Sequence, residues 1–173
     1  MTDYQNDTDC ITLIGMAGAG KSTLGKLLAH ELGWVFIDTD HLIEAQYGTN
    51  LQAVTDKMTK EEFLDVECNV VCNVRAKRCV IATGGSVVYR EAAMNHLNEL
   101  GPVCHLDVSL PIILERISQA PDRGLAIAPG QTVEDLYNER KALYKKYAKV
   151  SVPCDGKTPA ESVTAFIAAI GAL

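Results

Sequence analysis

Nine residues near the start of the chain form a glycine-rich loop of a type that holds phosphate groups. The loop reads Gly15-Met-Ala-Gly-Ala-Gly-Lys-Ser-Thr23 and fits the pattern G-x-x-x-x-G-K-[ST]. In this pattern the glycines turn main-chain N–H groups toward a polyphosphate, the lysine reaches its terminal oxygens, and the serine hydroxyl can hold Mg²⁺. An apolar run precedes the loop and helical periodicity follows it, as the pattern requires. We therefore predict a phosphorylated nucleotide as a ligand, bound through Gly15, Gly18, Ala19, Gly20, Lys21, Ser22 and Thr23.

Two carboxylates, Asp38 and Asp40, follow the second apolar run of the chain. In phosphoryl transfer one carboxylate can hold Mg²⁺ while another accepts a proton from the attacking hydroxyl. Asp40 could instead act only as the N-cap of a helix that begins at His41. The nearby phosphate loop favours the catalytic interpretation.

A short segment of small residues, Thr83-Gly84-Gly85-Ser86, follows the third apolar run. Minimal side chains here would let main-chain amides approach a ligand closely, although a plain turn has the same composition. Three arginines, Arg116, Arg123 and Arg140, are the cations whose positions suggest a role at a ligand. Solvated positions on helix faces are the ordinary alternative for arginines.

The elements that must position these residues alternate along the chain. Apolar runs predict strands at 10–14, 34–37, 79–82, 102–108 and 149–152. Helical periodicity and cap residues such as Thr59, Ser109 and Thr158 predict helices at 21–32, 59–76, 91–100, 109–118, 132–147 and 159–171. The alternation predicts an α/β fold with three layers, in which ligands bind beyond the carboxyl ends of the strands. The functional residues should therefore follow positions 14, 37, 83, 108 and 152.

Length and composition limit what the protein can do. The 173 residues, 47% of them hydrophobic, predict a single domain over 1–173. The net charge of −6 argues against nucleic acid or a membrane as a partner. A polar N-terminus and six cysteines predict a cytoplasmic protein with reduced thiols, and we expect a monomer. Residues 119–131, with two prolines and two glycines, are interpreted as a mobile lid.

Several motifs in order resemble the shikimate kinase family. Besides the phosphate loop they are Asp38-Thr39-Asp40, Glu61-Glu62-Phe63, Glu67, Thr83-Gly84-Gly85, the Arg116/Arg123 pair and Arg140-Lys-Ala-Leu-Tyr144. The resemblance implies a P-loop kinase fold with a five-stranded parallel sheet flanked by helices, and ATP and Mg²⁺ as cofactors. It also implies roles for single residues: Lys21 and Ser22 at ATP·Mg, Asp38 near the metal, Asp40 at the acceptor hydroxyl, Arg116 beside the adenine, Arg123 in the lid at the phosphates, and Arg140 on the acceptor carboxylate.

The chain departs from the family pattern at the acceptor site and the lid. The family has Phe-Arg, with an arginine that grips the shikimate carboxylate, where this chain has Phe63-Leu64. Ser86 replaces the third glycine of the family's G-G-G, and Arg123-Gly124-Leu125 replaces R-P-L. Glu67, which pairs with that arginine in the family, should then protonate or meet another cation. A substrate ammonium group would serve, so we predict a hydroxy amino acid such as homoserine as the acceptor, bound by Asp40, Glu67, Gly84, Gly85, Ser86 and Arg140.

Other functions fit parts of the same pattern. Lys60 or Arg90 could replace the missing arginine, in which case shikimate would remain the acceptor. A nucleoside monophosphate kinase would need more arginines around an acceptor phosphate than this chain offers. A nucleotide-binding regulator that has lost catalysis is the alternative outside enzymes. The prediction is an ATP-dependent kinase acting on a small carboxylate metabolite, with Lys21, Asp40 and Arg123 as its catalytic residues.

Overall fold

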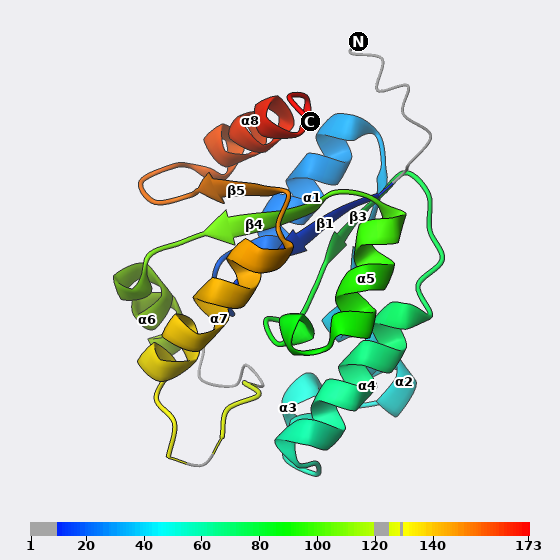
Figure 1. Cartoon of the computed structure of the whole chain (residues 1–173), viewed down its shortest axis with the longest axis vertical. Helices are drawn as coiled ribbons and strands as arrows, with labels where there is room; N and C mark the ends of the chain where they lie inside the picture. Colours follow the sequence, from blue (N-terminus) through cyan, green and yellow to red (C-terminus); the bar gives the residue numbers. More distant parts are fainter. Residues whose placement is uncertain (1–9, 120–124, 129) are drawn as a thin grey trace.

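The computed structural model describes residues 10–119, 125–128 and 130–173, which form one parallel sheet covered by helices (Figure 1). The strands are β1 (Cys10–Ile14), β2 (Val35–Asp38), β3 (Cys79–Ala82), β4 (Val103–Asp107) and β5 (Val150–Pro153). Their order in the sheet is β2-β3-β1-β4-β5, and each neighbouring pair is parallel. The helices are α1 (Lys21–Leu32), α2 (Thr39–Tyr47), α3 (Leu51–Thr55), α4 (Lys60–Cys72), α5 (Glu91–Leu100), α6 (Leu110–Ser118), α7 (Val133–Tyr147) and α8 (Pro159–Ile170), with a 3₁₀ turn η1 (Val87–Tyr89).

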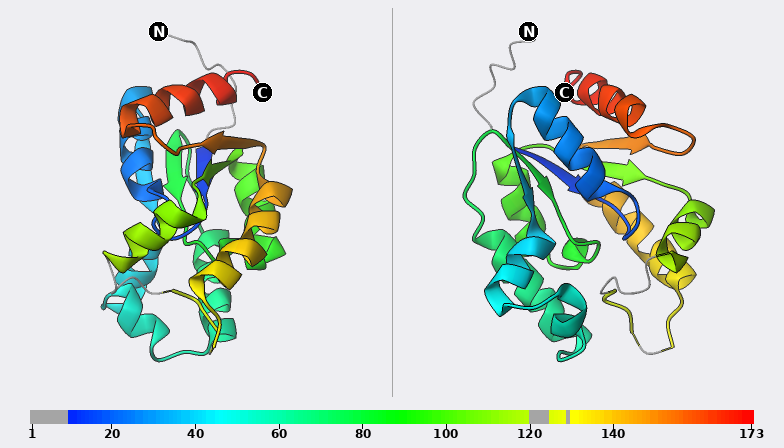
Figure 2. Two further views of the ribbon diagram at one scale, coloured as in Figure 1. Left: turned by 90° about the vertical axis from the view of Figure 1, so that its left-hand side faces the viewer. Right: turned by 180° about the vertical axis from the view of Figure 1, so that it is seen from behind.

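The helices lie on both faces of the sheet. The left view of Figure 2 shows α1 and α8 on one side of the strands and α5 and α7 on the other. Burial on both faces explains why the central strands are apolar without alternation. Every residue of β1 and of β3 is buried. The predicted three-layer α/β fold is therefore confirmed.

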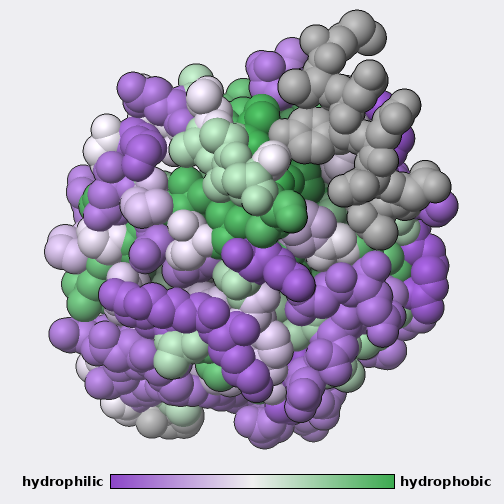
Figure 3. All heavy atoms as spheres, turned by 45° about the horizontal axis from the view of Figure 1, so that its top comes forward, coloured by the Kyte–Doolittle hydropathy of each residue, from purple (hydrophilic) through white to green (hydrophobic). Residues whose placement is uncertain are grey.

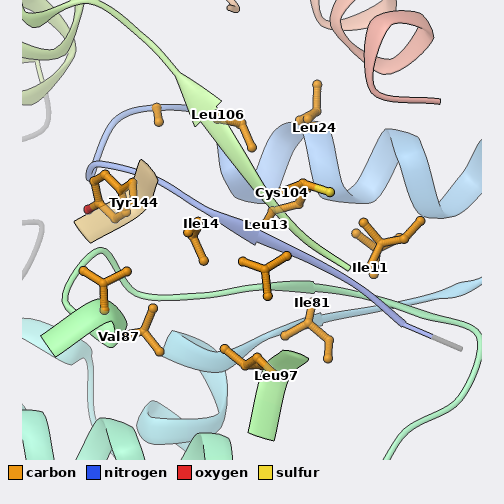
Figure 4. Close-up of a cluster of buried hydrophobic side chains, with 14 of the residues drawn as sticks. Ile11, Leu13, Ile14, Leu24, Ile81, Val87, Leu97, Cys104, Leu106 and Tyr144 are labelled. Atoms are coloured by element: carbon orange, nitrogen blue, oxygen red, sulfur yellow. The ribbon is translucent and has the colours of Figure 1, made fainter. Parts of the chain in front are cut away.

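The hydrophobic core is built around β1, the middle strand of the sheet. Leu13 and Ile14 have no exposed surface and point to opposite faces of the sheet (Figure 4). Leu13 lies on the side of α1, where a Cβ on Gly25 would be 3.4 Å from its Cδ1, and Ile14 lies on the side of Val87 and Tyr144. Tyr144 closes the end of this core that is nearest the phosphate loop, and its ring stacks on His105 of β4 with a centroid distance of 5.0 Å. The hydrophobic core thus extends to the carboxyl ends of the strands, where ligands are expected to bind.

Two of the predicted capping signals operate as expected. Thr59 and Glu62 form a capping box at the start of α4, and Thr158 does the same with Glu161 at α8. Ser109 precedes α6 but makes no capping hydrogen bond with its side chain. The predicted helix 59–76 is too long, because α4 ends at Cys72. The chain then turns back into the sheet, and Arg78 adopts a positive φ of 50° in this turn.

Two short helices after β2, namely α2 and α3, were not among the predicted helices, although the alternative role of Asp40 as an N-cap implied a helix from His41. A helix of nine residues and one of five are too short to be stable by themselves, so their sequence signal is weak. The Asn50 side chain caps α3 by accepting a hydrogen bond from the Ala53 N–H at 2.8 Å. These helices form one wall of the candidate site.

The end of the sheet where the strands begin, opposite the candidate site, carries apolar surface. A groove of about 420 Å³ is lined there by side chains that include Leu32, Trp34, Ile167 and Leu173. Figure 3 brings this end of the molecule forward and shows hydrophobic side chains gathered on it. Within the described ranges, no helix has both the length and the hydropathy of a membrane span.

Candidate active site

A cavity of about 300 Å³ lies at the carboxyl ends of β1, β2 and β3. Its walls come from the phosphate loop, the start of α2, the segment 83–86 and inward-facing side chains of α4 and α7. In Figure 1 helices α2, α3 and α4 lie on one side of this edge and α6 lies on the other. The segment 125–128 reaches the first group, because Ala126 packs with Ile43, Val54 and Phe63. The glycine-rich loop and both aspartates therefore line one shared cavity, as the sequence predicts.

The loop backbone has the shape that a bound polyphosphate needs. Gly18 and Gly20 adopt positive φ angles of 80° and 99°, a region that glycine enters at low cost. Gly20 is also the N-cap of α1 and gives it no side-chain cap, so the first amides of the helix remain available to an anion. Gly15 has no room for a side chain, because a Cβ there would lie 3.0 Å from the Leu106 carbonyl oxygen. The loop can therefore bind phosphate groups directly through its main-chain N–H groups.

Lys21 begins α1 and points its ammonium group into the loop. Its Nζ donates hydrogen bonds to the carbonyl oxygens of Gly15 at 2.8 Å and Met16 at 2.9 Å. Burial lowers the pKa of Lys21 to about 8, and the charges of Asp40 and Asp38 oppose this shift. Lys21 therefore stands as a buried cation between the loop and the two carboxylates.

Arg116 contacts the same loop from α6. Its Nη1 donates to the carbonyl oxygens of Gly18 at 3.0 Å and Ala19 at 3.2 Å. Arg116 and Thr23 both line a second cavity of about 420 Å³ beside the loop, which reaches Cys154 after β5. This cavity continues the phosphate cradle on the side away from Asp40, where a nucleotide base can lie.

Ser22 and Asp38 form a hydrogen-bonded pair next to the loop. The Ser22 hydroxyl donates to Asp38 Oδ2 at 2.6 Å, and Asp38 Oδ1 accepts from the Asp40 N–H at 3.1 Å. A hydroxyl and a carboxylate oxygen at this spacing are the hard ligands that Mg²⁺ prefers. The pair therefore fits a magnesium ion bound beside the phosphates.

The N-cap of α2 is Asp38 and not Asp40, because the helix begins at Thr39. The alternative of Asp40 as an N-cap is therefore wrong, and its side chain faces the cavity. Burial and the neighbouring charge of Asp38 raise the pKa of Asp40 to about 6. Among residues 10–119, 125–128 and 130–173, its Oδ1 has no hydrogen-bond partner. A buried carboxylate oxygen of this kind can accept a hydrogen bond from a ligand hydroxyl.

The segment after β3 packs tightly against α2 and α4. The Gly84 N–H donates to Thr39 Oγ1 at 3.3 Å, and a Cβ on Gly84 would collide with Glu67 Oε1. Ser86 Oγ donates to Glu67 Oε2 at 2.6 Å. The expectation that Glu67 must protonate or meet a cation overlooked this partner, because nothing in the sequence pairs residues 67 and 86. Gly85 is held by α7, because its carbonyl oxygen accepts a hydrogen bond from the Tyr144 hydroxyl at 2.7 Å.

Arg140 enters the cavity from α7 and is 1% exposed. Its Nη2 donates to the Ala126 carbonyl oxygen at 3.0 Å, and its Nε donates to the Tyr89 hydroxyl at 3.3 Å. The guanidinium also lies over the Tyr89 ring, 5.2 Å from its centroid. These contacts hold the cation in the cavity wall beside Gly85, where a Cβ would lie 3.0 Å from Arg140 Nη1. A ligand carboxylate can reach it there.

The two cations suggested as substitutes for the family's arginine contact other groups. Arg90 forms ion pairs of 2.8 Å with Glu61 and with Asp65 on the exposed face of α4. The Lys60 ammonium lies 4.8 Å from the centroid of the Tyr89 ring. Leu64 itself is 2% exposed. The structure therefore gives no support to a simple replacement of the arginine by Arg90.

Part of the cavity wall was missed by sequence reasoning. His41, Glu44, Asn50 and Gln52 line the cavity from α2 and from the turn and helix that follow. The cap residue Asn50 and the stop residue Gly48 were the available signals. Leu125 and Ala126 of the expected lid also line the cavity, whereas Arg123 lies outside the described residues.

Comparison with known proteins identifies the family. The family model described as shikimate kinase matches residues 17–171. The chain belongs to the shikimate kinase family. The shikimate kinase of a Sulfurihydrogenibium species is 34% identical over 161 residues, which cover 92% of this chain and 96% of that protein. The shikimate kinase of Thermodesulfovibrio yellowstonii is 36% identical over 154 residues, covering 87% and 88% of the two chains.

Solved structures agree with this assignment. The shikimate kinase from Acinetobacter baumannii in complex with shikimate has a TM-score of 0.85 and 28% identity, and the match covers 95% of this chain and 93% of that one. A gluconokinase from Sinorhizobium meliloti, with a TM-score of 0.60 and 15% identity over 97% and 94% of the chains, shares the fold alone. As a member of the shikimate kinase family, the protein is an ATP-dependent small-molecule kinase that uses Mg²⁺. The alternative of a non-catalytic regulator is therefore set aside.

Proposed function

We propose that this shikimate-kinase-family enzyme phosphorylates a hydroxy amino acid, with homoserine as the best candidate acceptor. The observation that carries the proposal is the charge of the acceptor cavity. The described wall of the shared cavity includes four carboxylates, namely Asp38, Asp40, Glu44 and Glu67, but only two Lys or Arg side chains, Lys21 and Arg140. With Asp38 and Lys21 assigned to ATP and Mg²⁺, three carboxylates and Arg140 remain for the acceptor. A purely anionic acceptor would enter a cavity with surplus negative charge, whereas a zwitterion would bring its own cation.

The buried Leu64 supports this choice. The resemblance implies that an arginine at this position grips the shikimate carboxylate in the family, and a leucine supplies no charge and no donor. Losing one partner of a desolvated charged contact costs about 2–5 kcal/mol, which is about 30-fold to several thousand-fold in affinity. Homoserine needs one cation for its carboxylate, and Arg140 is that cation in the proposal.

The reaction transfers the γ-phosphoryl group of ATP to the acceptor hydroxyl. The hydroxyl oxygen forms a bond to the γ-phosphorus, the bond from that phosphorus to the β–γ bridging oxygen breaks, and ADP leaves. Asp40 orients the hydroxyl and accepts its proton in this proposal, because it lines the cavity and its buried Oδ1 has no hydrogen-bond partner in the described part of the chain. Lys21 balances negative charge at the transferring group, and Arg123 is proposed to do the same from the lid.

Ser22 and Asp38 would hold Mg²⁺, which when bound neutralises charge on the phosphates. The main-chain amides of Gly15 to Thr23 would bind the phosphates, and Arg116 would lie beside the adenine. Gly84, Gly85 and Ser86 would form the floor under the acceptor. Residues 119–131 would close over the site and exclude water, since an open site would hydrolyse ATP.

Shikimate is the second candidate acceptor. The relatives that match over most of this chain are named shikimate kinases, and one solved relative holds shikimate. Two features argue for retention of this substrate: Arg140 remains in place and the Gly84-Gly85 pair is intact. The choice between the acceptors depends on whether the loss of the arginine at position 64 is decisive.

A panel assay tests the proposal. ADP release would be measured with ATP and Mg²⁺ and with homoserine, shikimate, threonine, gluconate or a nucleoside monophosphate as the acceptor. We expect the highest kcat/KM for homoserine. A preference for shikimate of tenfold or more would overturn the acceptor and leave the kinase activity unaffected.

Two variants of one residue sharpen the assay. Leu64→Arg should move selectivity toward shikimate by about tenfold or more, because it restores a cation beside Glu67. Leu64→Met is the matched control, since it keeps the volume and adds no charge. If both variants show the selectivity of the unchanged enzyme, position 64 does not discriminate between the acceptors.

We further propose that the enzyme acts as a single-domain monomer in the cytoplasm. The phosphate loop, both aspartates and Arg140 of one chain line the same cavity. ATP and reduced thiols are typical of that compartment. Light scattering after size exclusion tests the monomer, and a mass near twice 18.7 kDa would refute it.

A further inference from the structure

Glu67 differs from the other carboxylates of the cavity. It is buried, and among the described residues only one of its two carboxylate oxygens has a hydrogen-bond partner. It lies on the inner face of α4 and is 1% exposed. Ser86, itself 4% exposed, donates its hydroxyl to Glu67 Oε2 at 2.6 Å. The carboxylate is therefore fixed through one oxygen by a residue that replaces a glycine of the family pattern.

The second oxygen, Oε1, has no hydrogen-bond partner in the part of the chain that the structure describes. It lies against Gly84, where a Cβ would collide with it and would lie 2.9 Å from Asp40 Oδ1. Asp40 Oδ1 and Glu67 Oε1, which have no hydrogen-bond partner among the described residues, thus both lie close to Gly84. Burying a carboxylate oxygen without a hydrogen bond is unfavourable, so such an atom in a residue that lines a cavity indicates a missing donor.

The neighbouring cations do not supply that donor. Lys21 donates to two carbonyl oxygens of the phosphate loop, and Arg140 donates to Ala126 and Tyr89. The charged groups that face Glu67 are Asp40 from α2, Lys21 from α1 and Arg140 from α7, while Ser86 faces it from the loop after β3. Burial raises the pKa of Glu67 to about 7, and the Ser86 hydrogen bond opposes this shift.

We infer that Glu67 Oε1 binds the ammonium group of the acceptor, and that Ser86 is the positioning residue that keeps this oxygen turned toward the cavity. The inference rests on the proposed function, because it requires an acceptor with an amino group. A primary ammonium has three donors and can satisfy Oε1 directly. Asp40 Oδ1 then receives the hydroxyl and Arg140 the carboxylate. Three charged or polar groups of the acceptor thus meet three side chains around Gly84 and Gly85, which have no side chains in the way.

The test compares homoserine with 4-hydroxybutyrate, which keeps the hydroxyl and the carboxylate but lacks the amine. The measured quantity is the ratio of kcat/KM for the two acceptors. Glu67→Gln should lower this ratio by about 30-fold or more, because an amide of the same shape carries no charge. Ser86→Gly should lower it by several-fold, mainly through the KM for homoserine, and Ser86→Thr should restore it because threonine keeps the hydroxyl.

Glu44→Gln is the matched control, since it also removes one carboxylate charge from the cavity wall. Glu44 Oε1 accepts from the Leu51 N–H at 2.9 Å, so its role is to join α2 to α3. A general effect of charge would lower the ratio equally in the Glu44 and Glu67 variants, and this result would overturn the inference. An unchanged ratio in both Glu67→Gln and Ser86→Gly would also overturn it.

The two proposals fail in different ways. If the unchanged enzyme prefers homoserine to shikimate but the variants keep its homoserine to 4-hydroxybutyrate ratio, the ammonium site is wrong and the proposed function stands. If the unchanged enzyme prefers shikimate, both are wrong. If Glu67→Gln does not fold, Ser86→Gly alone decides, because that position is a glycine in the family pattern and tolerates the change.

Discussion

Replacing Tyr144 by phenylalanine should weaken acceptor binding without affecting ATP. Tyr144 lies on α7, is 1% exposed and donates its hydroxyl to the Gly85 carbonyl oxygen at 2.7 Å. Tyr137 on the same helix is 8% exposed and donates to the Val108 carbonyl oxygen at 3.1 Å. Both hydroxyls donate to a main-chain carbonyl oxygen, but of the two only the Tyr144 hydroxyl reaches the acceptor floor. It also lies 3.8 Å from the Met16 sulfur in the phosphate loop. Tyr137→Phe is therefore a matched control for Tyr144→Phe.

The magnitude follows from the two hydrogen bonds. Removing the donor to a buried carbonyl costs about 1–3 kcal/mol, so both variants should lose about this much free energy of unfolding. For Tyr144→Phe, losing a net 0.5–1.5 kcal/mol of support for Gly85 corresponds to about a 2- to 12-fold higher acceptor KM. Tyr137→Phe should show the loss of stability without the rise in KM.

Urea unfolding and steady-state kinetics measure the two effects separately. The acceptor is the one that the unchanged enzyme turns over best, and KM for ATP serves as the internal reference. Equal acceptor KM values for the two variants would refute the reasoning that the Tyr144 hydroxyl positions the floor of the acceptor site. A rise in KM for ATP alone would show that Tyr144 acts through the phosphate loop instead.

Three further predictions concern the cavity itself. Lys21→Met should abolish turnover while the circular dichroism spectrum keeps its shape; ordinary activity would defeat the assigned role of Lys21. Gly84→Ala should abolish acceptor phosphorylation, since the new methyl group would collide with Glu67 Oε1, while binding of a fluorescent ATP analogue persists. Glu67, with its pKa raised to about 7, must be ionised to bind an ammonium group. The homoserine to 4-hydroxybutyrate ratio of kcat/KM should therefore be constant above this pH and fall about tenfold for each pH unit below it, and a ratio independent of pH from 5.5 to 8.5 would contradict this.

Much of the fold was predictable because its signals are local. Each strand was predicted to within about one residue at either end, since short continuous apolar runs indicate a buried parallel sheet. Thr59 marked the start of α4 because a capping box needs only residues three apart, and Thr158 marked the start of α8 because Pro159 follows it. Helices α2 and α3 escaped prediction because tertiary contacts, and not propensity, stabilise helices of this length.

The candidate site likewise has residues that the sequence predicted and contacts that it did not. The phosphate loop, Asp38 and Asp40, and Gly84 and Gly85 could be read from the sequence because each is a short motif at the end of a strand. The Glu67–Ser86 hydrogen bond could not be read, since it joins residues 19 positions apart across the packing of α4 on the loop after β3. The assignment of the N-cap to Asp38 likewise needed the backbone angles of residue 38.

By itself, the sequence determined that this protein is a P-loop kinase of the α/β class. Phosphate binding depends on main-chain N–H groups and one lysine, and glycine spacing within nine residues sets their arrangement. Only the tertiary structure decided how the acceptor cavity is charged and which of its buried oxygens lack partners among residues 10–119, 125–128 and 130–173. Those properties depend on which side chains from α2, α4 and α7 meet, and the distances between these helices follow from the packing of the whole domain.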